Sequence, residues 1–174
     1  MATSDGPDAA AITRYITETY PDTIVGQSMG GTFFSCNEQS WPNFATLATT
    51  DDFDDASDLE CDGVFRLNIG VTGRTFDRRV DPSVEPDYTA LDRLLPHPVY
   101  AAQHWLSILN PSATSFETIV KPLLDEAHGI VSSREVRIRE GRTRDRTAQP
   151  RGDPPAPGPG KDAGDASLRA SDRA

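Results

Sequence analysis

Hydrophobic and polar residues alternate along residues 64–71 of this chain. Leu67 and Ile69 fall on one side of the alternation, whereas Arg66 and Asn68 fall on the other. A period of two residues is typical of a β-strand with one face turned to an apolar core. We therefore expect a strand that buries its apolar residues and presents Arg66 and Asn68 to solvent or to a ligand.

Helical spacing of apolar residues appears near both ends of residues 1–131. The pattern predicts helices over residues 8–20 and 114–131. Thr114, with a glutamate three residues later, has the spacing of a capping box at the start of the second helix. Pro122 predicts a kink or a second helix start, and Gly129 is a plausible end.

Short apolar runs bounded by turn signals predict further strands. Residues 105–109 are expected to pair beside the strand over 64–71. The other expected elements are strands over 23–25, 32–36 and 44–49, a short helix over 74–80, an extended connector over 95–100 and a helical turn over 87–95. The predicted fold class is therefore α+β, a small single domain whose antiparallel sheet of four to five strands has helices packed mainly on one face.

Composition changes after Val131. Residues 141–174 contain no aromatic residue and almost no aliphatic one. Such a segment buries too little apolar surface to offset the entropy lost on ordering. We therefore divide the chain into an α+β domain over residues 1–131 and a disordered tail over residues 132–174.

The predicted domain is strongly acidic. Residues 1–131 hold seven Lys and Arg against twenty Asp and Glu, a net charge of −13, and seven of these carboxylates lie in residues 51–62. That segment is expected to be a solvated loop or a short exposed helix. A body of this charge repels phosphate backbones, so nucleic acid is an unlikely partner. The alternative would need one face to gather five arginines, Arg66, Arg74, Arg78, Arg79 and Arg93.

Two cysteines and the absence of an apolar leader indicate a reducing compartment, and we expect a cytoplasmic protein, monomer or homodimer, without a membrane span. Zinc ligation by Cys61, His97 and His104 is disfavoured because no pair has the usual spacing. No metal and no cofactor is therefore predicted.

The best candidate for a ligand site is a surface of polar and aromatic residues. Arginine and asparagine can hold a carboxylate or an amide, and aromatic rings supply flat walls with polar edges. The candidate residues are Arg66, Asn68, His97, Tyr100, His104 and Trp105. The residue types favour a structural interpretation, in which Tyr100 and Trp105 are core, Arg66 pairs with an acid of residues 51–62 and His97 caps a loop.

These observations indicate a non-enzymatic domain that binds an unknown small molecule or a protein. An enzyme would need a pocket in which His97 or His104 lies within hydrogen-bond reach of Cys36, Cys61 or an acid. No catalytic residue is predicted.

Several segments, in order, resemble an uncharacterised bacterial family of unknown function, DUF6194. They are FRLNIGV (Phe65–Val71), ALDRLLPHPVY (Ala90–Tyr100), His104-Trp105, LNPS (Leu109–Ser112) and the helix containing PLLDEAH. The likeness spans roughly residues 10–131. The family in turn resembles, remotely, the MmcQ/YjbR-like domains, which implies an antiparallel sheet backed by helices and, as a further alternative, nucleic-acid binding. The resemblance implies no established activity.

Overall fold

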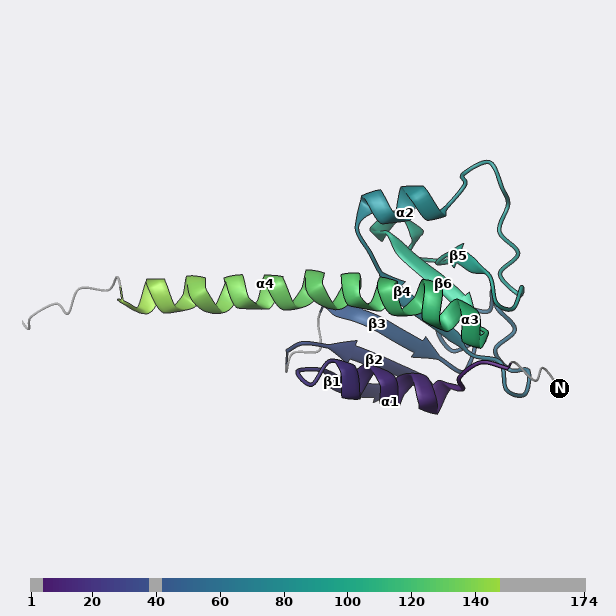
Figure 1. Ribbon diagram of the computed structural model, residues 1–174, viewed down its shortest axis with the longest axis horizontal. Helices are drawn as coiled ribbons and strands as arrows, with labels where there is room; N and C mark the ends of the chain where they lie inside the picture. The colour runs from purple at the N-terminus through teal and green to yellow at the C-terminus, as the bar shows by residue number, and fades with distance from the viewer. Residues whose placement is uncertain (1–4, 38–41, 148–174) are drawn as a thin grey trace, which may run out of the picture.

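The computed structural model describes residues 5–37 and 42–147 and is built around one antiparallel sheet of six strands in the order β1-β2-β3-β4-β6-β5 (Figure 1). The strands are β1 (Ile24–Ser28), β2 (Gly31–Ser35), β3 (Asn43–Ala48), β4 (Arg66–Gly70), β5 (Leu94–Pro96) and β6 (Trp105–Leu109). This arrangement confirms the predicted α+β class. It also confirms the expected pairing of β4 with β6, in which Gly70 lies opposite Trp105.

The edge strand β5 was not predicted. We expected a helical turn over residues 87–95, and that prediction is wrong. Asp92 adopts a left-handed conformation with φ of 54°, which interrupts a helix. The backbone N–H of Asp92 instead donates to the carbonyl of Leu109 at 2.8 Å, and Leu95 pairs with Ser107. Pro96 ends the strand at the sheet edge, where a residue without an N–H is tolerated.

Helices cover one face of the sheet (Figure 1). Helix α1 (Ala9–Thr19) begins at Asp8, whose carboxylate accepts from the N–H of Ala11 at 2.7 Å. The C-terminal helical segment consists of α3 (Ala113–Ser115), the π-helical η2 (Phe116–Val120) and α4 (Lys121–Thr147). The core between helices and sheet is fully apolar at its centre and includes Ile12, Ile16, Leu67, Ile69, Leu106, Ile108, Val120 and Leu124.

The C-terminal helical segment starts earlier than predicted. Ser112 is its cap, because the Ser112 hydroxyl accepts from the N–H of Ser115 at 3.1 Å, and Thr114 lies inside the first turn rather than capping it. The expected irregularity before Pro122 is confirmed. A short first helix and a π-helical turn precede α4, so Pro122 lies in the first turn of α4. The missing N–H of a proline is tolerated in a first turn.

Helix α4 continues through Gly129, which we expected to end it, and past Val131 to Thr147, so residues 132–147 of the predicted tail are helical (Figure 1). Gly129 lacks the positive φ that a glycine helix end would show. Beyond Val131 the helix is supported locally. An ion pair joins Glu135 to Arg139 at 3.1 Å, in the favourable i,i+4 order. The rest of the predicted tail, residues 148–174, lies outside the described residues.

The opposite face of the sheet carries irregular segments and one short 3-10 helix instead of α-helices. Residues 51–62 cross it as a series of turns, and η1 (Ala101–Gln103) precedes β6. The remaining helix, α2 (Gly73–Arg79), starts at Thr72, whose N–H and hydroxyl both donate to Glu126 of α4. Among the described residues, no helix has both the length and the apolar character needed to cross a bilayer.

Candidate functional site

Strand β4 separates two different environments. Leu67 and Ile69 point into the apolar core beneath the helices, as the alternation predicts. Arg66 and Asn68 lie on the opposite face, but they do not reach solvent, since their exposed fractions are 1 % and 3 %. The expectation of a solvent-facing pair is therefore corrected. Polar side chains buried this deeply must find hydrogen-bond partners within the protein.

The partner of Arg66 is Asp54, from the acidic segment over residues 51–62. Two parallel hydrogen bonds join them, from Nη1 to Oδ1 at 2.8 Å and from Nη2 to Oδ2 at 2.5 Å. Nη1 also donates to the hydroxyl of Ser57 at 2.9 Å. The hydrogen bonds from Arg66 lower the pKa of Asp54 against the opposing effect of burial. The pair is thus fully charged at neutral pH, and its net charge is zero.

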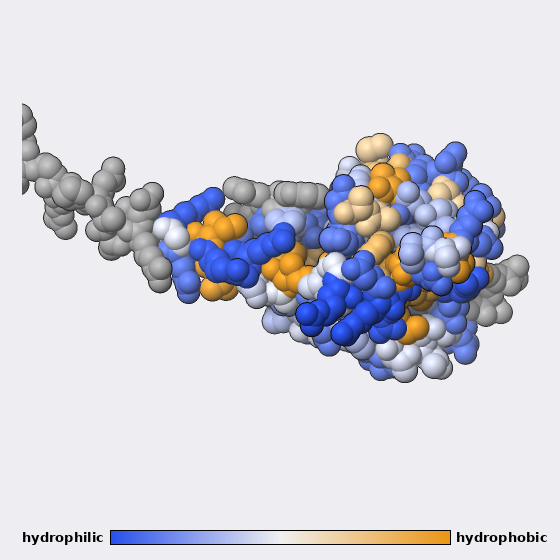
Figure 2. All heavy atoms as spheres, turned by 90° about the horizontal axis from the view of Figure 1, so that it is seen from above, coloured by the Kyte–Doolittle hydropathy of each residue, from blue (hydrophilic) through white to orange (hydrophobic). Residues whose placement is uncertain are grey.

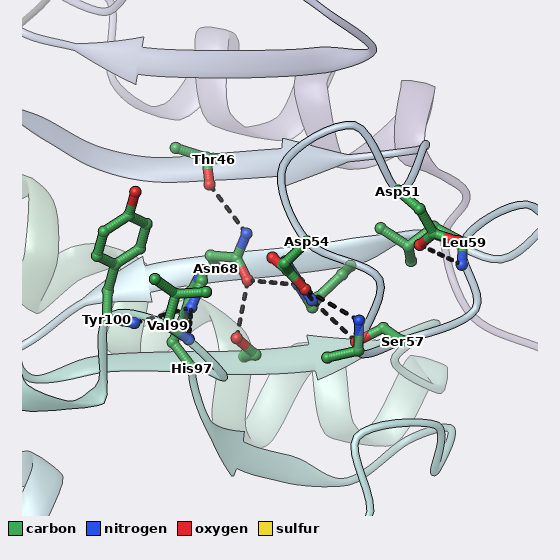
Figure 3. A network of polar contacts seen from close by, with 12 residues as sticks. Thr46, Asp51, Asp54, Ser57, Leu59, Asn68, His97, Val99 and Tyr100 are labelled. Atoms are coloured by element: carbon green, nitrogen blue, oxygen red, sulfur yellow. Dashed lines mark hydrogen bonds and ion pairs between the residues drawn. The ribbon is translucent and has the colours of Figure 1, made fainter.

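Asn68 connects three strands through its side-chain amide. Its Oδ1 accepts from Nε of Arg66 at 3.1 Å and from the hydroxyl of Ser107 at 2.8 Å. Its Nδ2 donates to the hydroxyl of Thr46 at 3.0 Å. These contacts join β3, β4 and β6 across the sheet (Figure 3). Because every polar partner is fixed by another, the network has little freedom to rearrange.

His97 follows β5 and is buried, with an exposed fraction of 4 %. Its Nδ1 accepts from the backbone N–H groups of Val99 and Tyr100, at 3.0 and 3.2 Å (Figure 3). A nitrogen that accepts carries no proton, so Nε2 bears the hydrogen of the neutral ring. Burial, and then the nearby Arg66 guanidinium, lower the pKa of His97 to about 4, and Asp54 opposes this only in part.

A cavity of about 770 Å³ opens over this face of the sheet. All six candidate residues line it, namely Arg66, Asn68, His97, Tyr100, His104 and Trp105. Phe33 and Phe53, which meet edge to face with centroids 5.8 Å apart, form an aromatic wall that sequence reasoning missed. Gly70 lets the indole of Trp105 lie close to the strand, since a Cβ there would come within 3.1 Å of the ring.

The surroundings of His97 and His104, the two histidines that the enzyme alternative would need, are structural. His104 adopts a left-handed conformation with φ of 63° at the end of η1, and its ring lies 5.7 Å from that of Phe76. Within the described ranges, neither His97 nor His104 hydrogen-bonds to a cysteine or a carboxylate. The nucleic-acid alternative needed five arginines on one face, and Arg66 is not available for it, because its charge is buried and paired with Asp54.

A family model described as a family of unknown function (DUF6194) matches residues 7–141 of the chain. The chain belongs to this family. Membership of DUF6194 confirms the resemblance drawn from the sequence segments, and it carries no activity with it. The remote MmcQ/YjbR likeness is not shown. Neither the curated proteins nor the solved structures gave a match.

This DUF6194 chain also brings together residues that sequence reasoning treated separately. His128 lies inside α4, which continues for many residues beyond it. Its Nε2 lies 2.8 Å from Oδ1 of Asp22, and its ring stacks on Tyr20 with centroids 4.5 Å apart. Neither contact leaves a signal in the local sequence, because the partners are more than a hundred residues away.

Proposed function

We propose that the cavity over β4 binds a small, flat, uncharged organic molecule that carries a hydrogen-bond acceptor. The observation that carries this proposal is the buried Arg66–Asp54 pair beside a neutral His97. A cavity of about 770 Å³ has the volume of an ordinary small-molecule site, for which 300–1,000 Å³ is typical.

The charge balance argues against an anionic ligand. Nη1 and Nη2 of Arg66 both donate to the carboxylate of Asp54, so these two donors are not available to hold a ligand carboxylate. A charged ligand that reached this buried pair would have to separate it, which is costly. The other arginine that lines the cavity, Arg134, is exposed, so water screens its charge. The sequence suggested a ligand with a carboxylate or an amide. The same reasoning argues against the carboxylate and favours an amide or another neutral group.

The polar contacts and walls define the remaining chemistry. Because Nδ1 of His97 accepts from the backbone, Nε2–H is the donor that the ring can offer to a ligand. Trp105, Tyr100, Phe33 and Phe53 supply aromatic surfaces that suit a planar molecule. A histidine whose pKa is about 4 is a weak general base at neutral pH, which supports binding rather than catalysis.

The proposal is tested with a pair of probes that differ in charge, quinoline-3-carboxamide and quinoline-3-carboxylate. Melting temperatures of the full chain are measured with each probe, and contact is checked by saturation-transfer NMR. A ligand that binds only the folded state must raise the melting temperature. We expect the carboxamide to stabilise and the carboxylate to have little effect.

Gly70→Ala supplies the matched variant. Its added Cβ would lie within 3.1 Å of the Trp105 ring, so the indole, which lines the cavity, would have to shift by a few tenths of an ångström. The rise in melting temperature caused by the carboxamide should then be smaller, whereas Gly129→Ala, whose added Cβ meets open space on α4, should keep the full rise. A larger shift with the carboxylate, or no NMR contact for either probe, would contradict the proposal.

A further inference from the structure

Three side chains with metal-ligating atoms converge away from the cavity over β4. They come from the turn after α1, the residue that follows β2 and the first third of α4, and they are Asp22, Cys36 and His128. One carboxylate oxygen, the thiol sulfur and one imidazole nitrogen lie within 4.8 Å of one another. Cys36 follows Asp22 by 14 positions and His128 follows Cys36 by 92, so the three residues form no sequence motif.

The histidine ring in this cluster is held in place by its neighbours. Tyr20 stacks on it at 4.5 Å with an interplanar angle of 19°, and Phe44 meets it edge-on at 5.3 Å. The hydroxyl of Tyr20 is itself fixed, since it donates to Asp125 at 2.5 Å. The ring is therefore held in one orientation, with Nε2 directed at Asp22. A metal or ligand site needs side chains fixed in this way.

We propose that Asp22, Cys36 and His128 bind a zinc-type divalent transition metal. Thiolate sulfur, imidazole nitrogen and carboxylate oxygen are the ligands that Zn²⁺ uses in proteins, and the sulfur selects it over Mg²⁺ and Ca²⁺. Ligand atoms around a tetrahedral zinc stand roughly 3.5 Å apart, so atoms within 4.8 Å need only small side-chain rotations.

The fourth ligand is assigned to water. The side chain of Asp22 is 51 % exposed, whereas that of His128 is 18 % exposed, so the cluster is open to solvent on the Asp22 side. Three protein ligands and one open position are the arrangement of zinc sites that bind a further small molecule. The carboxylate of Glu135 lies close enough to influence Cys36, although its ion pair with Arg139 offsets part of its negative charge.

A cysteine nucleophile activated by His128 is the competing interpretation. Burial, and then Asp22 and Glu135, raise the pKa of the Cys36 thiol to about 12, so the group is protonated and unreactive at neutral pH. Metal binding replaces that proton. The thiol loses H⁺ to solvent as the sulfur–metal bond forms. Nε2 of His128 can bind the ion only when it carries no hydrogen, so in the metal-bound state the ring hydrogen is on Nδ1.

The test is a titration of the full chain, freed of metal with a chelator, with Co²⁺ and then with Zn²⁺. We expect one ion per chain, intense visible bands of tetrahedral cobalt and a near-ultraviolet thiolate-to-cobalt charge-transfer band, all removed when Zn²⁺ displaces the cobalt. Cys36→Ser should abolish the charge-transfer band and weaken binding at least about 100-fold, and His128→Asn should weaken it similarly.

Cys61→Ser is the matched control, because Cys61 is the only other cysteine and is exposed. It should leave the spectrum and the affinity unchanged. Circular dichroism and melting temperatures in chelator establish that each variant folds before its affinity is compared. Weak octahedral cobalt bands without charge transfer, or a charge-transfer band that Cys61→Ser abolishes and Cys36→Ser keeps, would overturn the proposal.

Discussion

The guanidinium of Arg66 and the carboxylate of Asp54 form a two-pronged ion pair in which the two side chains are only 2 % and 12 % exposed. The pair joins the centre of the sheet to the acidic segment over residues 51–62. That segment therefore does more than solubilise the chain, since one of its carboxylates closes the face of the sheet on which the cavity lies.

Replacing Asp54 by asparagine is predicted to destabilise the protein strongly. The variant keeps the size of the side chain but leaves the charge of Arg66 buried without its partner. Removing one member of a buried pair typically costs about 3–5 kcal/mol. The free energy of unfolding, measured by chemical denaturation, should fall by an amount in that range.

Asp55→Asn is the control for this prediction, because Asp55 is the next residue of the same acidic segment and is exposed. It removes the same charge from the same segment and should change the free energy of unfolding by less than about 0.5 kcal/mol. Equal effects of the two substitutions would mean that the acidic segment acts through its overall charge and not through the contact with Arg66.

Protein stability is predicted to fall between pH 6.5 and pH 4 because of His97. The pKa of this ring is about 4 in the folded protein, against 6.5 when unperturbed. Between these values the unfolded chain takes up a proton that the folded chain refuses, so acidification favours unfolding. The loss should reach about 3 kcal/mol by pH 4, as measured by denaturation at a series of pH values.

His97→Asn separates this effect from the titration of carboxylates. The amide oxygen of asparagine can accept from the N–H groups of Val99 and Tyr100, as Nδ1 of His97 does, but it does not titrate. The variant should show a flatter dependence of stability on pH over the same interval. An identical pH dependence in both proteins would show that His97 is not the group responsible.

Gly129→Ala is predicted to stabilise the protein by about 0.5–1 kcal/mol. Gly129 lies inside α4 with an ordinary helical backbone, and an added Cβ meets nothing within 4 Å. Alanine is then the more stable residue at this position, because glycine loses more backbone entropy on folding. Denaturant midpoints of the two proteins give the measurement.

Gly141→Ala provides the comparison on the same helix. Its added Cβ also meets open space, but Gly141 is close to the C-terminal end of α4. That end of the helix projects beyond the sheet (Figure 1). The alanine should increase the helical content of this end of α4 and so raise the helical signal in circular dichroism. It should not shift the denaturant midpoint of the whole protein, because this end of the helix unfolds locally, independently of the core. A shift as large as that of Gly129→Ala would show that the projection unfolds together with the sheet.

The parts of the fold that the sequence predicts are those with a strong local period. The alternation around Leu67 and Ile69 identifies β4, and the spacing of Ile12 and Ile16 identifies α1, because each pattern reports which side of an element is buried. Strand β5 has only three residues and therefore no period. Its existence depends on hydrogen bonds that β6 supplies, which a local pattern does not contain.

The length of α4 shows a different limit of sequence reasoning. We treated the change of composition after Val131 as a sign of disorder. The projecting helix carries only scattered apolar residues on a mostly hydrophilic surface (Figure 2), and Val136 and Ile138 are about half-exposed. Arginine and glutamate are good helix formers in solvent, so the helix continues without burial.

The six residues chosen from sequence line one cavity, whereas binding of a ligand there stays a prediction. Sequence reasoning allowed Arg66 to pair with an acid of residues 51–62, but nothing local distinguishes Asp54 among seven carboxylates. The cluster of Asp22, Cys36 and His128 was out of reach for a similar reason. Its members meet only because the turn after α1, the residue that follows β2 and the first third of α4 fold against one another.

The 27 residues of α4 form a rod roughly 40 Å long, much of which stands clear of the body (Figure 1). A rod fixed to a small globule increases hydrodynamic drag far more than it increases mass. A single chain of 18.9 kDa should therefore leave a gel-filtration column early, at a volume that a compact standard would assign to a larger particle. Light scattering or sedimentation equilibrium, which weigh the particle directly, are the methods that will distinguish a monomer from a homodimer here.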